Sequence, residues 1–223
     1  MTRKIALVSG VAAALLLGVT SSASAGTLDQ QQTSSNTDAG LFATQSVAQT
    51  FTAGITGSLD QAALLVFKSG TPAEPLIVEV RNTSAGAPGT SVLASASIPT
   101  SAIGTAPATF VPVTFTTPSA VTAGTQYALV AYTTHVTNDW GGWRYQAATN
   151  PYSGGSGFST NDPVPPMVGW NQQPNNDYAF KTYVTPPPSP SPPNTGQPTK
   201  KKCKKKKHKH HAASAKKHCK KKK

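Results

Sequence analysis

The sequence predicts an all-β protein built as an antiparallel sandwich, followed by a disordered linker and a strongly basic tail. Between residues 41 and 185, short apolar runs alternate with polar residues and are separated by Gly, Pro, Asn and Ser. No segment of this part sustains the 3.6-residue period of an amphipathic helix. Many short strands with turn residues between them are typical of an antiparallel sandwich.

Eight runs in this part are predicted strands because their apolar residues alternate or cluster over four or more positions. In chain order they cover residues 46–52, 59–67, 76–81, 91–98, 108–115, 126–132, 143–146 and 178–184.

Alternation also predicts which side chains share a face of a strand. In the run that starts at residue 59, it would place one set of side chains on a common face: Leu59, Gln61, Ala63, Leu65 and Phe67. In the run that starts at residue 76, it would place Leu76, Val78 and Val80 inward. Glu79 and Arg81 would then point outward.

The segments around these strands carry their own signals. Residues 26–40 are polar and rich in Gln, Ser and Thr, which indicates a flexible lead-in. NTSAGAPGT, at residues 82–90, predicts a loop between paired strands. Pro112 has no N–H to donate, so its strand should lie at a sheet edge or carry a bulge. PPPSPSPPNTGQPT, at residues 186–199, predicts a semi-rigid spacer that separates the sandwich from the tail.

The charges divide the chain into two parts of opposite sign. Residues 200–223 contain 14 lysines, four histidines and no acidic residue. Residues 26–199 contain four basic residues against eight acidic ones, a net charge of −4. A block of like charge repels itself and cannot bury a core, so the tail is expected to be an interaction segment.

Residues 1–25 have the pattern of a secretory signal peptide. Arg3 and Lys4 form a positive n-region, an apolar stretch covers residues 5–19, and Ala23-Ser24-Ala25 supplies a small-residue cleavage pattern. The alternative is an uncleaved anchor, but about fifteen apolar residues are fewer than the ~20 that a membrane span needs. We therefore expect a secreted or cell-surface protein with no transmembrane segment.

Four stretches carry a resemblance to a known family: SVAQTFTAGITGSLDQAALLV, PLIVEVRNTSAGAPGTSVLASASIP, FVPVTFTTPSAVTAGTQYALVAY and DYAFKTYV. Together they resemble the bacterial choice-of-anchor extracellular β-sandwich domains, R type, over residues 46–184. The resemblance implies a jelly-roll-like module on exported proteins with differing C-terminal anchors, and no catalytic motif. The lysine-rich tail stands at the anchor position. Residues 193–196 resemble the core of a sortase signal, but proline replaces leucine and no hydrophobic stretch follows.

Aromatic and polar residues of the last third are the candidates for a ligand site. Two groups, one in NDWGGWRYQ and one further along the chain, contain them: Trp140, Trp143, Arg144, Tyr145, Trp170 and Asn171. Aromatic rings stack on the apolar faces of sugars, and amide or charged groups bind hydroxyls. The alternative is structural, because large aromatic side chains are usually buried, and Trp143 and Tyr145 could alternate into the core.

The residues favour no catalytic chemistry. His135 is the one histidine of the sandwich, and it lies in a Thr/Asn-rich turn without a nucleophile motif nearby. The sequence cannot place two carboxylates at the separation that a glycosidase needs. We therefore expect a non-enzymatic protein without a cofactor or bound metal. A structural calcium ion at Asp139, Asp162 or Asp177 stays an alternative, although these residues match no calcium-loop pattern.

The tail is predicted to bind polyanions through counterion release, without reading a sequence. Outside a cell these are anionic wall polymers, acidic polysaccharides, lipid headgroups and non-specifically bound nucleic acid. The lysines expected to make such contacts include Lys200, Lys201, Lys202, Lys204, Lys205, Lys206, Lys207, Lys216, Lys217 and Lys220. Cys203 and Cys219 could form a disulfide or stay as thiols, while the surrounding positive charge opposes a metal site.

These features predict a secreted, non-enzymatic adhesion or binding module with carbohydrate as the candidate ligand, retained on anionic surface polymers by its tail. Two alternatives from other classes stay open. One is an enzyme or enzyme accessory that acts on polysaccharide. The other is an extracellular matrix protein that binds polyanions or DNA.

Overall fold

The structure is a computed structural model that describes residues 26–134, 141–163 and 165–189. The chain divides after Pro188 into two units. The signal peptide expected at residues 1–25 lies outside the described residues, as do almost all of the second unit and the predicted basic tail.

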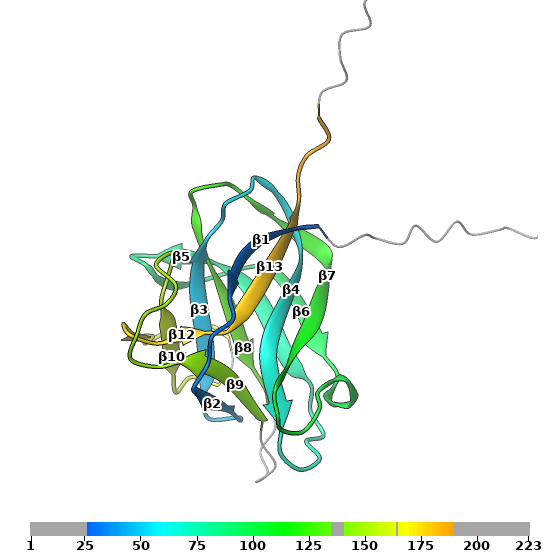
Figure 1. Ribbon diagram of the computed structural model, residues 1–223, viewed down its shortest axis with the longest axis vertical. Helices are drawn as coiled ribbons and strands as arrows, with labels where there is room; N and C mark the ends of the chain where they lie inside the picture. The colour runs from blue at the N-terminus through cyan, green and yellow to red at the C-terminus, as the bar shows by residue number, and fades with distance from the viewer. Residues whose placement is uncertain (1–25, 135–140, 164, 190–223) are drawn as a thin grey trace, which may run out of the picture. The chain divides into compact units, whose positions relative to one another are not determined.

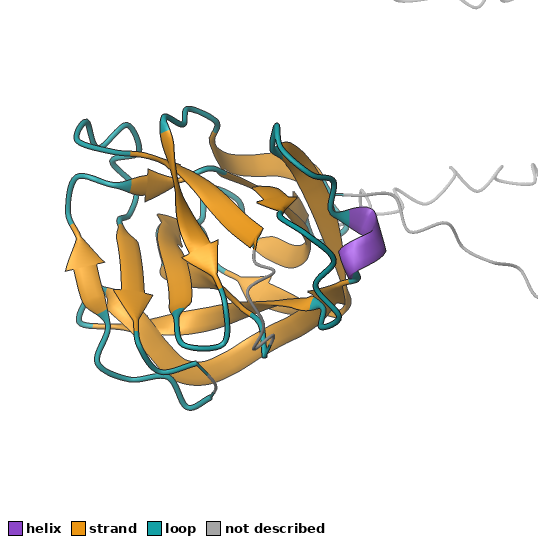
Figure 2. Ribbon diagram, turned by 90° about the horizontal axis from the view of Figure 1, so that it is seen from below, coloured by secondary structure: helices purple, strands orange, loops and turns teal. Residues whose placement is uncertain are grey.

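Two antiparallel sheets pack face to face and confirm the predicted all-β sandwich (Figures 1 and 2). The seven-stranded sheet contains β1 (Thr27–Gln32), β2 (Thr37–Leu41), β4 (Gly57–Lys68), β7 (Thr109–Val121), β9 (Gly141–Gln146), β12 (Asp177–Tyr178) and β13 (Phe180–Thr185). The six-stranded sheet contains β3 (Ser46–Thr52), β5 (Leu76–Ser84), β6 (Ala87–Ile98), β8 (Gln126–Tyr132), β10 (Gly157–Thr160) and β11 (Asn171–Gln173).

One short 3-10 turn, η1 (Thr100–Ala102), is the only helical element in the described ranges (Figure 2). Within those ranges no helix is long and apolar enough to cross a membrane.

The strand order joins distant parts of the sequence. One sheet runs β1-β13-β4-β9-β12, with β2 on β9 and β7 on β4, and the other runs β11-β10-β3-β8-β5-β6. The first and last strands therefore pair, with Thr27 opposite Val184. The start of β1 and the end of β13 lie at the same end of the sheet (Figure 1).

Strand β8 in the middle of the six-stranded sheet is buried on both faces, which explains its dense apolar sequence. In β8, Leu129 packs in the main core between the sheets, whereas Val130 belongs to a second cluster on the outer face. The segment after β10 contributes the fully buried Met167 to that second cluster. A strand with both faces buried reads as a continuous apolar run rather than a half-polar alternation.

Seven of the eight predicted strands are each present as one strand, and two of them, β3 and β8, have the predicted boundaries. The run predicted at residues 178–184 is divided between β12 and β13, which pair with different strands. Pro112 lies in β7, an edge strand that pairs with β4, as its missing N–H requires.

The prediction of a loop at residues 82–90 is wrong for most of these residues. The strands β5 and β6 continue to a tight turn at Ala85 and Gly86, whose φ angles of 50° and 81° give the left-handed conformation that such hairpins need.

The flexible lead-in predicted at residues 26–40 is wrong, because this segment forms β1 and β2. β1 is held by its backbone pairing with β13, and it is polar because it lies at the sheet edge. One of its glutamines, Gln32, is buried and donates to the carbonyl of Asp177 at 2.8 Å.

The common face predicted for β4 is wrong at Leu59, which lies in the core, because a bulge interrupts the alternation. Opposite β13, Leu59 pairs with Val184 and Gln61 with Tyr183, so Asp60 is an extra residue in β4. The pairing of β4 with β7 shifts register at the same point. Beyond the bulge, Leu64 and Val66 enter the core, and Leu65 and Phe67 lie on the outer face. One inserted residue exchanges the two faces of the rest of the strand.

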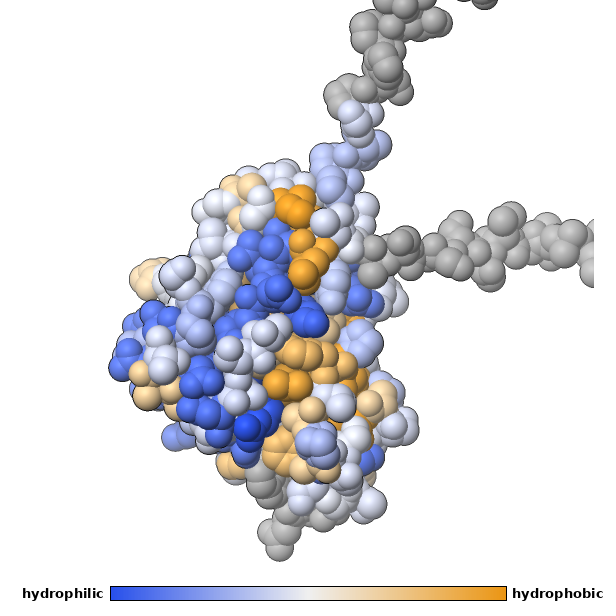
Figure 3. Space-filling model, viewed as in Figure 1, coloured by the Kyte–Doolittle hydropathy of each residue, from blue (hydrophilic) through white to orange (hydrophobic). Residues whose placement is uncertain are grey.

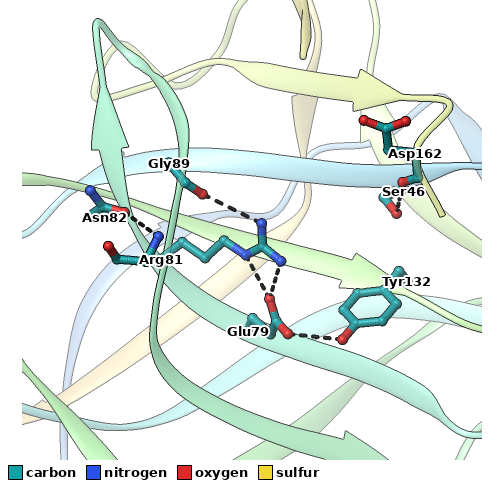
Figure 4. Close-up of polar contacts among 8 residues, drawn as sticks. Ser46, Glu79, Arg81, Asn82, Gly89, Tyr132 and Asp162 are labelled. Carbon is teal, nitrogen blue, oxygen red and sulfur yellow. Dashed lines mark hydrogen bonds and ion pairs between the residues drawn. The ribbon is translucent and has the colours of Figure 1, made fainter. Parts of the chain in front are cut away.

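Glu79 and Arg81 lie on the outer face of β5, as predicted, but both are buried. Figure 4 shows the Arg81 guanidinium against the Glu79 carboxylate. Arg81 Nη2 lies 2.5 Å from Glu79 Oε2, and Arg81 Nε donates to the same oxygen at 2.6 Å. The hydroxyl of Tyr132 donates to the other oxygen of Glu79 at 2.9 Å. Burial, together with Glu79, raises the pKa of Tyr132 to about 12, so its hydroxyl stays protonated as the donor.

We expect Arg81→Met to lower the free energy of unfolding by about 3–5 kcal/mol, because it leaves the Glu79 charge buried without its partner. Urea denaturation measures the loss. The triple change of Glu79→Leu, Arg81→Met and Tyr132→Phe removes every member of the group, so its loss should be smaller than that of Arg81→Met alone. Arg144→Met breaks a part-exposed pair and serves as the control, with an expected loss of at most about 1 kcal/mol. Equal losses for Arg81→Met and Arg144→Met would contradict the interpretation.

Candidate functional site

Strand β9 separates the candidate residues of NDWGGWRYQ onto its two faces. Trp143 and Tyr145 point toward the core, and Arg144 points to the outer face of the seven-stranded sheet. Trp140 lies outside the described residues, as do His135 and Asp139.

Trp143 is a core residue and does not face a ligand. Its side chain is 0% exposed, and its Nε1 donates to the carbonyl oxygen of Ala179 at 2.8 Å. Its ring lies 4.8 Å from that of Tyr178, and Tyr145 lies 5.3 Å from the same ring. The structure therefore supports the alternative in which Trp143 is buried in the core. Tyr145 is half-buried against the same core.

Trp170 and Asn171 lie in the other sheet, away from the residues of β9. Asn171 is exposed in the edge strand β11, and Trp170 packs against the second hydrophobic cluster. The indole Nε1 of Trp170 is buried and lacks a hydrogen-bond partner. The six candidates therefore do not form one site, because the described members divide between the core and two outer surfaces.

The outer face of the seven-stranded sheet carries a hollow of about 430 Å³ beside Arg144, which we call the Arg144 hollow. The residues that define it come from strands β2, β4 and β9 and from the segment before β7: Asp38, Leu65, Phe67, Pro107, Ala108 and Arg144. Its volume falls within the roughly 300–1,000 Å³ of small-molecule sites.

Asp38 and Arg144 stand directly opposite each other on β2 and β9. The guanidinium Nη1 donates to Asp38 Oδ1 at 3.1 Å, and the two side chains are 27% and 31% exposed, Arg144 first. The pair therefore presents hydrogen-bond donors and acceptors together at the surface, in an orientation that two paired strands define.

Phe67 reaches its place in the hollow because Gly142 has no side chain. A Cβ on Gly142 would stand 2.6 Å from a carbon of the Phe67 ring, closer than any contact that a real side chain makes. Gly142 lies within β9, where its role is to allow this close approach. Phe67 and Asp38 were missed as candidates because residues that meet across strands leave no local motif.

The apolar surface continues beyond the hollow along β4 and β7. Leu65 pairs with Phe110 across these strands, and both side chains are half-exposed. The ammonium of Lys181 lies over the Phe110 ring, 4.5 Å from its centre. Figure 3 shows an apolar area on this face next to a strongly polar one.

A second hollow of about 430 Å³ lies beside Trp170 on the six-stranded sheet, and we call it the Trp170 hollow. It is lined by the β5–β6 hairpin and the segment before β11, including Asn82, Ser84, Thr90, Met167, Val168 and Trp170. Asn82 Oδ1 is already engaged, because it accepts from the Ser91 N–H at 3.1 Å. A third cavity, at the end near Leu41 and Ile103, measures about 30 Å³ and is too small for an organic ligand.

Asp177 is a buried carboxylate whose contacts are structural. It is 0% exposed, and its two oxygens accept from Gln49 Nε2 at 3.0 Å and from the Tyr152 N–H at 3.0 Å. Burial raises its pKa above the ordinary value of 3.8, and the two hydrogen bonds offset part of that effect. These contacts join β3 and β12 to the segment before β10.

No group of three or more His, Cys, Asp or Glu side chains in the described residues could hold a metal ion. No protein-family model matches the sequence, and no curated protein matches it significantly.

We expect Trp143→Phe to lower the free energy of unfolding by about 1–2 kcal/mol, because it removes a buried hydrogen bond and some volume. Trp170→Phe is the matched control. Its indole N–H already lacks a partner, so the change should stay within about 0.5 kcal/mol or be stabilising. Chemical denaturation of both variants measures the difference, and a larger loss for Trp170→Phe would contradict the assignment.

The raised pKa of Asp177 predicts a pH-dependent effect. The folded protein holds the proton more tightly than the unfolded chain, so the contribution of this group is greatest below the unfolded pKa and is lost as pH rises through the folded pKa. The difference in unfolding free energy between the wild type and Asp177→Asn should therefore shift in favour of the wild type as pH falls from about 7 toward about 4. Urea denaturation at several pH values tests this, and the opposite trend would refute it.

Proposed function

We propose that this chain is an exported, non-enzymatic binding module that its lysine-rich tail retains on anionic surface polymers. The observation that carries the proposal is the division of charge: 14 lysines and no acidic residue in residues 200–223, after a part with a net charge of −4. A dense row of lysines gains affinity for any polyanion by releasing its counterions.

The tail chemistry favours diffuse attraction over shaped recognition. Lysine is a strongly hydrated point charge, whereas arginine would offer a planar fork for specific phosphate contacts. Residues 200–223 contain no aromatic residue, so the tail has no side chain that could stack on nucleic-acid bases. These features favour anionic wall polymers over a defined nucleic-acid sequence as the partner.

The body of the protein would then be the part that the tail holds at the surface. A rigid sandwich with a mixed polar and apolar hollow on its outer face supports a binding role for that body, with glycans as the ligand class. The resemblance to choice-of-anchor domains is part of the same proposal, and it favours a module of this kind over an enzyme. A matrix protein whose body is only a spacer is the second candidate, and the charged tail alone would favour it.

Deleting residues 200–223 should release the protein from an anionic wall preparation or from teichoic acid immobilised on beads. Sedimentation at low salt measures the bound fraction. About 1 M NaCl should release the full-length protein too, because it shortens the screening length to about 3 Å.

Two controls accompany the deletion. Lys181→Gln removes one positive charge from the sandwich and should leave retention unchanged. The thermal midpoint of the deletion variant should equal that of the full-length protein, which shows that the sandwich is intact. Full retention of the deletion variant at low salt would refute attachment by the tail.

A further inference from the structure

We propose that the Arg144 hollow is a binding site for a neutral saccharide. This inference rests on the proposed binding role of the sandwich, and it names the surface and the chemical class of the ligand. Three properties of the hollow support it: its hydrogen-bonding groups, its apolar surface and its balance of charge.

The hydrogen-bonding groups suit vicinal hydroxyls. A sugar hydroxyl both donates and accepts, so a good site offers acceptors and donors side by side. Asp38 supplies carboxylate oxygens, and Arg144 supplies guanidinium N–H groups beyond the Nη1 that binds Asp38 at 3.1 Å. The two side chains orient each other across paired strands, so binding a ligand would cost little additional ordering.

The apolar wall suits the C–H face of a pyranose ring. Phe67 is half-exposed and lies against the backbone of Gly142, which leaves no room for a side chain beneath the ring. Leu65 lies on the same outer face, and the Leu65–Phe110 pair extends the apolar surface along the sheet. A ligand longer than one sugar could therefore continue from the hollow onto Phe110, where Lys181 covers one side of the ring.

The charge balance favours a neutral ligand. The carboxylate and guanidinium that line the hollow cancel each other, so neither an anionic nor a cationic sugar gains from its net charge. This separates the hollow from the tail, which binds by net charge alone. The two parts of the chain would thus recognise chemically different polymers.

The Trp170 hollow has the same volume but lacks this combination. No charged side chain lines it, and the oxygen of Asn82 is held by a backbone N–H. The indole N–H of Trp170 is itself buried, so it does not face a ligand in this conformation. This hollow therefore provides a control of equal size on the opposite face.

Isothermal titration calorimetry of the full-length protein with neutral hexasaccharides tests the proposal. The probes are cellohexaose, xylohexaose, maltohexaose and chitohexaose, in about 0.5 M NaCl to screen the tail. At least one hexasaccharide should bind the wild type with a Kd in the micromolar to millimolar range.

Three variants locate the site. Ala108→Arg fills the Arg144 hollow and should abolish binding. Arg144→Gln removes the guanidinium and should weaken binding about tenfold or more. Thr90→Arg adds the same side chain to the Trp170 hollow and should change nothing.

The possible outcomes separate this inference from the proposed function. If Ala108→Arg and Arg144→Gln bind as the wild type does, the site is wrong even though the module binds glycans. If Thr90→Arg alone abolishes binding, the Trp170 hollow is the site. If no hexasaccharide binds the wild type, the neutral-saccharide proposal is overturned, while retention by the tail is decided by its own deletion experiment. Near-ultraviolet circular dichroism of the buried Trp143 shows that each variant is folded.

Discussion

The two sheets of this sandwich are joined across the core by hydrogen bonds between Gln49 of β3 and strand β12. The amide of Gln49 donates to the Asp177 carboxylate at 3.0 Å and accepts from the Tyr178 N–H at 2.7 Å. Buried polar groups stabilise a fold only when they are paired, and these contacts specify where β12 must lie. Tyr178 then packs on Trp143. The inward position of Trp143 in turn places Arg144, its neighbour in β9, on the outer face beside Asp38. The geometry of the candidate site thus depends on an interaction inside the core.

The two outer faces of the sandwich differ in what covers them. The six-stranded sheet buries a second apolar cluster, with Met167 and Phe158 among its members, next to the ion pair of Glu79 and Arg81. Such a pair contributes little net stability but makes misplacement of either partner costly, because an unpaired buried charge is expensive. The seven-stranded sheet keeps a partly exposed apolar surface, with Leu65 and Phe110 on it. Among the described residues, the part-exposed ion pair of Arg144 and Asp38 therefore stands beside accessible apolar side chains on this face.

Sequence patterns predicted the fold class and most of the strands, because burial of apolar side chains in strands is a local signal. They failed where partners distant in the sequence decide the outcome. β1 was missed because its stability comes from pairing with β13 rather than from apolar residues. Leu59 was wrongly grouped with the face of Leu65 and Phe67 because a bulge at Asp60 has no sequence signature that alternation can detect. Among the site candidates, Arg144 is accessible and Trp143 is buried, which agrees with their alternation along β9. The contribution of Asp38 to the hollow beside Arg144 depends on the pairing of β2 with β9, which has no local signal in the sequence.

The pairing of the first and last strands has a mechanical consequence. β13 lies between β1 and β4 in the sheet, and the chain continues from Thr185 toward the tail. A protein that is tethered through its C-terminal segment and pulled through its body receives the load at Thr185. When the pull runs along the strand, the hydrogen bonds on both sides of β13 share the load and resist together, instead of opening one after another as they would if the pull ran across the strand. The strand that leads to the tail is thus supported on both sides against shear.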